Sequence, residues 1–194
     1  GQLQSKILVL KGRAHVEINE VEQAKLAYQE ALDYSASNIQ AQLGMAQVYL
    51  LKNQTSQART HINQALKLSA INANALVMLA SIEQKEGYTD KALTIISQVI
   101  ALNPENFPAL LTRASLYLEQ NKFESALADL EVILAKIPNE PKANYLKVVA
   151  TSAMGDLATS QETVDHLNIV LSGLPNDVMQ QNPVYLYLAG VVNF

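Results

Sequence analysis

Apolar side chains recur along the chain at the spacing of amphipathic helices, and residues 73–106 show the pattern most clearly. The apolar positions there are Leu76, Leu79 and Ala80, followed by Ala92, Ile96, Val99 and Ile100. They fall at i, i+3, i+4 in the first half and at i, i+4, i+7, i+8 in the second, which places each set on one face of a helix. Gly87 separates the halves, where a left-handed helix end suits a residue without a β-carbon. The stretch therefore predicts a hairpin of two helices.

The same pattern returns every 34 residues. An alanine series runs through Ala24, Ala58, Ala92 and Ala126. The turn positions in step with it are Asn19, Asn53, Gly87 and Asn121, which are residue types that tolerate positive φ. Asn38, Asn72 and Asn106 stand at the repeat ends as candidate helix caps. The chain therefore predicts an all-α array with repeats at about 5–38, 39–72, 73–106, 107–140 and 141–177, and a partial repeat at 178–194.

The fifth repeat departs from this rhythm. Its first helix is expected to begin at Pro141, since proline suits a first helical position. Its second helix has Leu167 and Leu171 at core spacing, three residues later than the period requires. We expect a longer second helix over residues 157–172, with Gly173 as a left-handed glycine at its end.

Composition narrows the functional classes. A net charge of −4 argues against binding a nucleic-acid backbone, which needs a basic stripe. The absence of cysteine excludes disulfides and thiolate chemistry. No apolar run reaches the roughly 18 to 20 residues of a membrane span. Charged residues make up only 16%, and Gln and Asn carry much of the polar surface, which indicates a neutral, hydrogen-bonding exterior.

No pattern of residues indicates catalysis. The sequence shows no nucleophile–base pair, phosphate-binding glycine loop or cluster of metal ligands, so we expect no enzyme, no cofactor and no metal. His15 is expected to be half-buried between helices, and His61 to be solvated. The acidic residues of the fourth repeat are interpreted as a solvated face: Glu119, Glu124, Asp129 and Glu131.

The 34-residue helical repeat resembles the tetratricopeptide repeat (TPR) family, whose pattern is W-x2-L-G-x2-Y…A-x3-F…P. The third repeat supplies Leu76-x2-Leu79-Ala80, Ala92-x3-Ile96 and Pro104, while the tryptophan position is degenerate. The resemblance implies a right-handed α-solenoid of antiparallel helix pairs, whose inner surface is lined by the first helix of each repeat.

That inner surface implies a partner-binding groove. The inward positions of the family map onto Arg13, Glu17, Gln40, Leu43, Gln47, Asn74, Val77, Ser81, Lys85, Leu111, Ser115, Glu119, Lys142, Tyr145 and Val149. The two-carboxylate clamp of chaperone-binding relatives is absent, because Val9 and Arg13, or Leu43 and Gln47 one repeat on, occupy its first Lys and Asn positions. A protein or peptide segment of another kind is the expected partner.

A second resemblance lies at residues 138–156, PNEPKANYLKVVATSAMGD. This string is similar to the TPR-repeat lipoproteins encoded with bacterial PEP-CTERM/exosortase systems, which are periplasmic and associated with exopolysaccharide production and protein sorting. The resemblance implies a part of a longer protein in the periplasm, with a lipid anchor to the outer membrane; the cytoplasm is the alternative. It also leaves a second function open, a glycan-binding array, with Tyr145 as its aromatic platform.

Overall fold

The computed structural model describes residues 1–173, apart from the side chains of Leu157 and Val170. This part of the chain is an all-α helical-repeat solenoid with ten helices and no strand. The helices are α1 (Gln2–Glu17), α2 (Val21–Tyr34), α3 (Ile39–Leu51), α4 (Thr55–Leu68), α5 (Ala73–Lys85), α6 (Thr89–Leu102), α7 (Phe107–Glu119), α8 (Phe123–Lys136), α9 (Pro141–Ala153) and α10 (Leu157–Ser172). The partial repeat expected at 178–194 lies outside the described residues.

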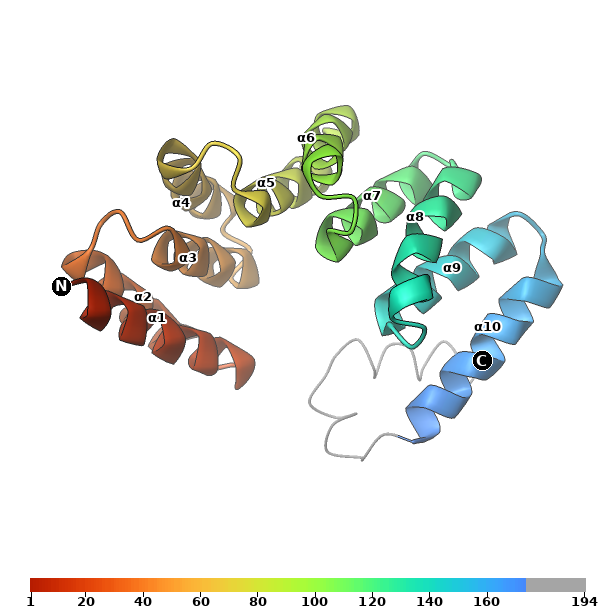
Figure 1. The fold of residues 1–194 in the computed structure, drawn as a ribbon, viewed down its shortest axis with the longest axis horizontal. Helices are drawn as coiled ribbons and strands as arrows, with labels where there is room; N and C mark the ends of the chain where they lie inside the picture. The colour runs from red at the N-terminus through yellow and green to blue at the C-terminus, as the bar shows by residue number, and fades with distance from the viewer. Residues whose placement is uncertain (174–194) are drawn as a thin grey trace. The chain divides into compact units, whose positions relative to one another are not determined.

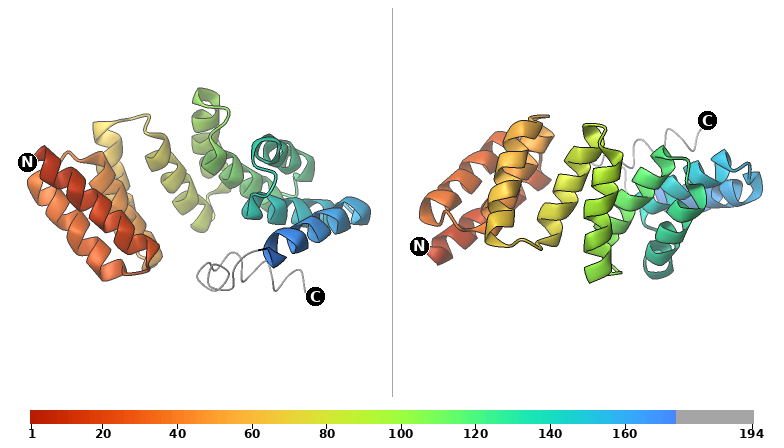
Figure 2. Two further views of the ribbon diagram at one scale, coloured as in Figure 1. Left: turned by 60° about the horizontal axis from the view of Figure 1, so that its bottom comes forward. Right: turned by 90° about the horizontal axis from the view of Figure 1, so that it is seen from above.

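The chain forms two compact units, Gly1–Val99 and Ile100–Phe194, which we call unit 1 and unit 2. In unit 1, α1 packs on α2 and α3 on α4 as antiparallel pairs, and α1 also contacts α3 (Figure 1 and Figure 2). In unit 2, α7 packs on α8 and α9 on α10, and α7 contacts α9. Within each unit, the first helices of neighbouring repeats therefore lie together on one side.

The predicted helices are confirmed one by one. The second helices begin at a constant interval of 34 residues, at positions 21, 55, 89, 123 and 157. All four members of the alanine series, from Ala24 to Ala126, are fully buried. A methyl group at this position lets the paired helices approach closely, whereas a longer side chain would force them apart.

The turns and caps also follow the sequence. Asn19, Asn53 and Asn121 have φ of 60°, 59° and 56°, and Gly87 has a φ of 84°. Each turn of this series thus contains the residue type that its backbone conformation requires. The side chains of Asn38, Asn72 and Asn106 each accept a hydrogen bond from the backbone N–H three residues on, as helix caps do.

The fifth repeat confirms the expected longer second helix but corrects how that helix ends. α10 has 16 residues where α8 has 14. It begins in phase at Leu157, and the buried Ser160 and Leu167 lie 34 residues after Ala126 and Ile133. The expected three-residue shift of the core is therefore wrong, and the additional residues lie at the C-terminal end of the helix. Gly173 has a φ of −84° and is not left-handed. The reason is that Gly173 occupies the C-cap itself, and a left-handed conformation belongs to the residue after the cap.

The connection between the first two repeats carries an additional polar contact. Ser5 is fully buried, and its hydroxyl donates to the carbonyl of Ala31 at 2.8 Å. The same hydroxyl accepts from Asn38 Nδ2 at 2.7 Å, while Asn38 Oδ1 caps α3 through the N–H of Ala41. Asn38 therefore joins α1 to the start of α3. The Ser5 position holds isoleucine, alanine, phenylalanine and proline in the later repeats, so they have no hydroxyl there.

The two asparagine caps should differ in their contribution to stability. We expect Asn72→Ala to lower the free energy of unfolding by about 1 kcal/mol, the usual value of a cap. Asn38→Ala should cost about 1 kcal/mol more, since it also leaves the buried Ser5 hydroxyl without its donor. Urea unfolding of both variants, followed by circular dichroism, measures the difference. Equal losses would show that the contact between Asn38 and Ser5 contributes nothing.

Candidate functional site

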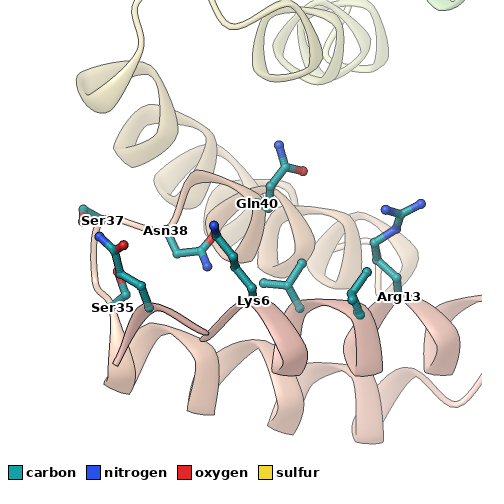
Figure 3. A pocket seen from close by; sticks show the side chains of 9 residues that line it. Lys6, Arg13, Ser35, Ser37, Asn38 and Gln40 are labelled. Carbon is teal, nitrogen blue, oxygen red and sulfur yellow. The ribbon is translucent and has the colours of Figure 1, made fainter. Parts of the chain in front are cut away.

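The first-helix side of unit 1 carries two pockets, of which the first lies between α1 and α3 and holds about 550 Å³. Lys6 and Arg13 extend from α1 on the same side, and Gln40 stands on the neighbouring α3 (Figure 3). The other residues that line it are Gln2, Val9, Leu10, Ser35, Ser37 and Asn38. The pocket thus combines an apolar floor with cationic, hydroxyl and amide groups.

The second pocket holds about 520 Å³ and is lined by α1, α3 and α5, with one side chain from α2. Its lining residues are Arg13, Tyr28, Gln40, Leu43, Gly44, Gln47, Leu50, Asn74, Val77 and Met78. Arg13 and Gln40 line both pockets, so the two form one continuous surface. We call the residues of the two pockets together the unit 1 groove.

The unit 1 groove contains part of the predicted partner-binding set: Arg13, Gln40, Leu43, Gln47, Asn74 and Val77. The other predicted residues of unit 1 lie outside it. Ser81 donates its hydroxyl to the carbonyl of Val77 at 3.0 Å, and Lys85 donates to Asn53 Oδ1. Glu17 is exposed on α1, one turn after Arg13.

The predicted residues of unit 2 lie on α7 and α9 and stay predictions: Leu111, Ser115, Glu119, Lys142, Tyr145 and Val149. Unit 2 has a smaller pocket of about 220 Å³, which none of them lines. Asn144 and Lys147 from α9 and His166 from α10 are among its lining residues.

The charge of the unit 1 groove differs from that of the chain. Lys6 and Arg13 line it, and none of the described lining residues is acidic. The chain as a whole carries a net charge of −4. The groove is therefore a locally positive surface on an acidic protein, which favours an anionic ligand group.

Tyr28 of α2 reaches the groove from the hydrophobic core. Its side chain is only 1% exposed, and it packs with Leu8, Ala24 and Met45 in the first core cluster. Tyr28 nevertheless lines the second pocket, and no protein atom hydrogen-bonds to its hydroxyl. Burial raises the pKa of the phenol, and the Glu17 carboxylate adds to this effect against the opposing Arg13 charge. The hydroxyl is therefore protonated at neutral pH and can donate.

The sequence did not single out Tyr28, because its position belongs to an apolar core series. The residue type nevertheless distinguishes Tyr28, because the equivalent positions hold Ile62, Ile96 and Leu130, whose side chains have no polar atom. A tyrosine among aliphatic side chains carries a hydroxyl that must reach a partner or a surface.

Asp129 corrects the interpretation of the fourth repeat as a solvated acidic face. It is 5% exposed and accepts two hydrogen bonds from Arg113, one from Nε at 2.7 Å and one from Nη2 at 2.6 Å. This two-point pairing is the strongest geometry for arginine and a carboxylate. The hydrogen bond and charge of Asp129 raise the pKa of Arg113. The pair joins α7 to α8 and has a structural role.

His61 is not solvated, contrary to the expectation. Its ring stacks on Tyr49 with centroids 5.4 Å apart, and its Nδ1 donates to Gln42 Oε1 at 2.7 Å. Burial lowers the pKa of His61. His15 is half-buried as expected, and its Nδ1 lies 2.7 Å from Glu20 Oε2.

The part of the chain that the structure describes offers no cluster of three or more His, Asp or Glu side chains suited to a metal ion. Within the same residues, no helix combines the length and the apolar character needed to cross a membrane.

Two family models described as tetratricopeptide repeat match residues 9–75 and 83–149, together more than half of the chain. The chain therefore belongs to the tetratricopeptide repeat family. Repeats of this family generally mediate protein–protein interaction.

Solved structures share the fold at low sequence identity. PilW, a type IV pilus biogenesis factor, is 18% identical with a TM-score of 0.79, over 98% of this chain and 87% of PilW. TTC0263, a TPR protein of Thermus thermophilus, is 16% identical with a TM-score of 0.79, over 98% of this chain and 100% of TTC0263. YrrB, a TPR protein with an unusual peptide-binding site, is 18% identical with a TM-score of 0.60, over 96% of this chain and 91% of YrrB. No curated protein sequence matches this chain.

Acidification should lower the free energy of unfolding, because His61 becomes protonated. In the unfolded chain His61 is protonated near its ordinary pKa of 6.5, whereas burial lowers this pKa in the folded chain. The stability that neutral His61 provides is therefore complete above about pH 6.5 and is lost as the pH falls through the lower folded pKa. His61→Phe keeps an aromatic ring against Tyr49 and removes the titration.

We therefore expect urea midpoints of the wild type to fall more than those of His61→Phe between about pH 7.5 and about pH 5.5. All other titrating groups are common to both proteins, so the difference reports His61. Parallel pH profiles would contradict the assignment.

Proposed function

We propose that this chain is a non-enzymatic scaffold that binds an extended segment of a partner protein in the unit 1 groove. The observation that carries this proposal is the continuity of the groove across three first helices through Arg13 and Gln40. An extended segment can run along such a surface and contact several repeats in turn.

The chemistry of the groove supports a peptide as the ligand. Leu43, Val77 and Met78 supply apolar contact, while the amides of Gln40 and Gln47 can donate to and accept from a peptide backbone. Both pockets of the unit 1 groove have volumes within the usual range for ligand sites, about 300 to 1,000 Å³. Apolar patches with a few polar groups that fix orientation are typical of peptide recognition.

A glycan partner is the second candidate. Sugars bind well on exposed aromatic rings, and the only aromatic side chain that lines the described groove is Tyr28, whose ring is buried. Tyr145, the expected sugar platform, lies on α9 outside this groove. We therefore favour the peptide.

A substitution that fills the groove tests the proposal. The probe is a displayed library of short random peptides selected on the full chain, and peptides enriched in the selection are resynthesised. Gln47 is exposed and lines the second pocket, so Gln47→Trp should weaken the binding of these peptides at least about tenfold without unfolding the protein.

Gln57→Trp is the matched control, because Gln57 is also exposed, lies on α4 and lines neither pocket. Binding should be unchanged in this variant. Equal loss in both variants, or no enriched peptide at all, would overturn the proposal. Binding of a bacterial exopolysaccharide that Gln47→Trp abolishes would establish the glycan instead.

We further propose that the partner belongs to a protein-sorting system of the bacterial envelope that is associated with exopolysaccharide. The support is the resemblance at residues 138–156. Fractionation of the producing bacterium should recover the protein with the periplasm or the outer membrane. Recovery with the cytoplasmic fraction would contradict this location.

A further inference from the structure

We propose that the Tyr28 hydroxyl and the Arg13 guanidinium form a subsite of the unit 1 groove that binds a carboxylate of the partner peptide. The proposal rests on the proposed function, because it names the chemistry of the segment that the groove takes. It assigns a ligand-binding role to a residue of the hydrophobic core.

Two glycines let the Tyr28 ring pass between helices. A β-carbon added to Gly12 of α1 would stand 2.6 Å from Tyr28 Cε1, and one added to Gly44 of α3 would stand 2.5 Å from Tyr28 Cζ. Both distances are far below van der Waals contact, so any other residue at either position would collide with the ring. The two helices thus leave space at these glycines, which the Cδ1, Cε1 and Cζ atoms of the ring fill.

The Tyr28 hydroxyl has no hydrogen-bond partner in the protein. Tyr28 is 1% exposed, lines the second pocket and receives no hydrogen bond from the protein. A buried polar group without a partner costs free energy, about 1 to 3 kcal/mol. Because the neighbouring pocket is large enough for a peptide side chain, a ligand atom can supply the missing hydrogen bond.

The surroundings select an acceptor with negative charge. Burial keeps the phenol protonated, so it donates. Arg13 lines the same pocket and adds a permanent positive charge, while Gln40, Gln47 and Asn74 supply amide donors. A carboxylate accepts from all of these groups, whereas an ammonium or guanidinium group would meet Arg13 and no acidic lining residue.

The other hairpins cannot form the same subsite. The position equivalent to Tyr28 holds isoleucine or leucine in repeats two to four. The position equivalent to Gly44 holds Leu10, Met78, Thr112 and Leu146, so no glycine pair opens a gap there. The subsite therefore fixes the register of the partner segment at the first repeat.

The test uses the full chain and the peptides selected from the random library. Each peptide is resynthesised with its Asp and Glu residues replaced by Asn and Gln, and each version is made with a free and with an amidated C-terminus. We expect the acidic versions to bind the wild type about tenfold more tightly than their amide counterparts. The arm that loses affinity shows whether the carboxylate is a side chain or the C-terminus.

Tyr28→Phe removes the hydroxyl alone, and it should abolish this preference for acidic peptides. Its urea midpoint should not fall, since the hydroxyl that it removes has no partner in the folded protein. Arg13→Gln should reduce the preference as well, and the effect should weaken at high salt. The matched controls are Tyr34→Phe, at an exposed tyrosine at the end of α2, and Lys11→Gln, an equal charge change on α1 outside both pockets.

The outcomes separate the subsite from the proposed function. Peptides that bind the groove without any preference for acidic residues would overturn the subsite but not the proposed scaffold function. A preference for acidic residues that survives Tyr28→Phe and Arg13→Gln would also overturn it. If no peptide binds the wild type, the proposed function itself fails.

Discussion

The close packing of two helices around one small side chain is the constraint on which every hairpin depends. The alanines at positions 24, 58, 92 and 126 are fully buried where the paired helices meet. Short turns join the helices of a pair, and in each turn of the series one asparagine or glycine adopts a left-handed conformation. A hairpin of this size cannot bury its apolar face alone, so it is stable only when stacked on a neighbour. Each repeat packs its helices in the same way, so the second helices begin at a constant interval along the chain.

Periodic features could be predicted from the sequence because each depends on local chemistry. An asparagine at a turn or a cap satisfies backbone groups within a few residues of itself, whatever the rest of the chain does. Contacts between polar side chains on different helices are not periodic in this way. Asp129 lies at the repeat position of Ala27, His61, Ile95 and Thr163, and the side chains at this position are buried or half-buried. The polar residues there were expected in water because their partners, Arg113 for Asp129 and Gln42 for His61, lie on another helix.

The groove residues likewise divide into those that sequence periodicity predicts and those that it does not. The resemblance identified which faces of the first helices carry Arg13, Gln47 and Val77, since those positions follow directly from helical phase. It could not identify Tyr28, which comes from a second helix and belongs by its phase to the core. Only the structure shows that its ring lies against Gly12 and Gly44 and that its side chain lines the second pocket. That information depends on the distance between α1 and α3, which sequence periodicity does not give.

The contact between the first two repeats contains residues that lower stability and that the later repeats lack. Glycine within a helix is less favourable than alanine by about 0.5 to 1 kcal/mol, and Gly12 and Gly44 both lie inside helices. The equivalent of Gly12 in the next three repeats is alanine: Ala46, Ala80 and Ala114. Isoleucine at position 28 would fill the core without a buried hydroxyl, as Ile62 does. Gly12 and Tyr28 occupy the glycine and aromatic positions of the family pattern, so their packing on each other is that of the family. The departures are Gly44 and the Tyr28 hydroxyl, which come together where Arg13 lines the second pocket, and departures from local rules concentrate at functional sites. The combination is therefore better explained by recognition of a ligand than by packing.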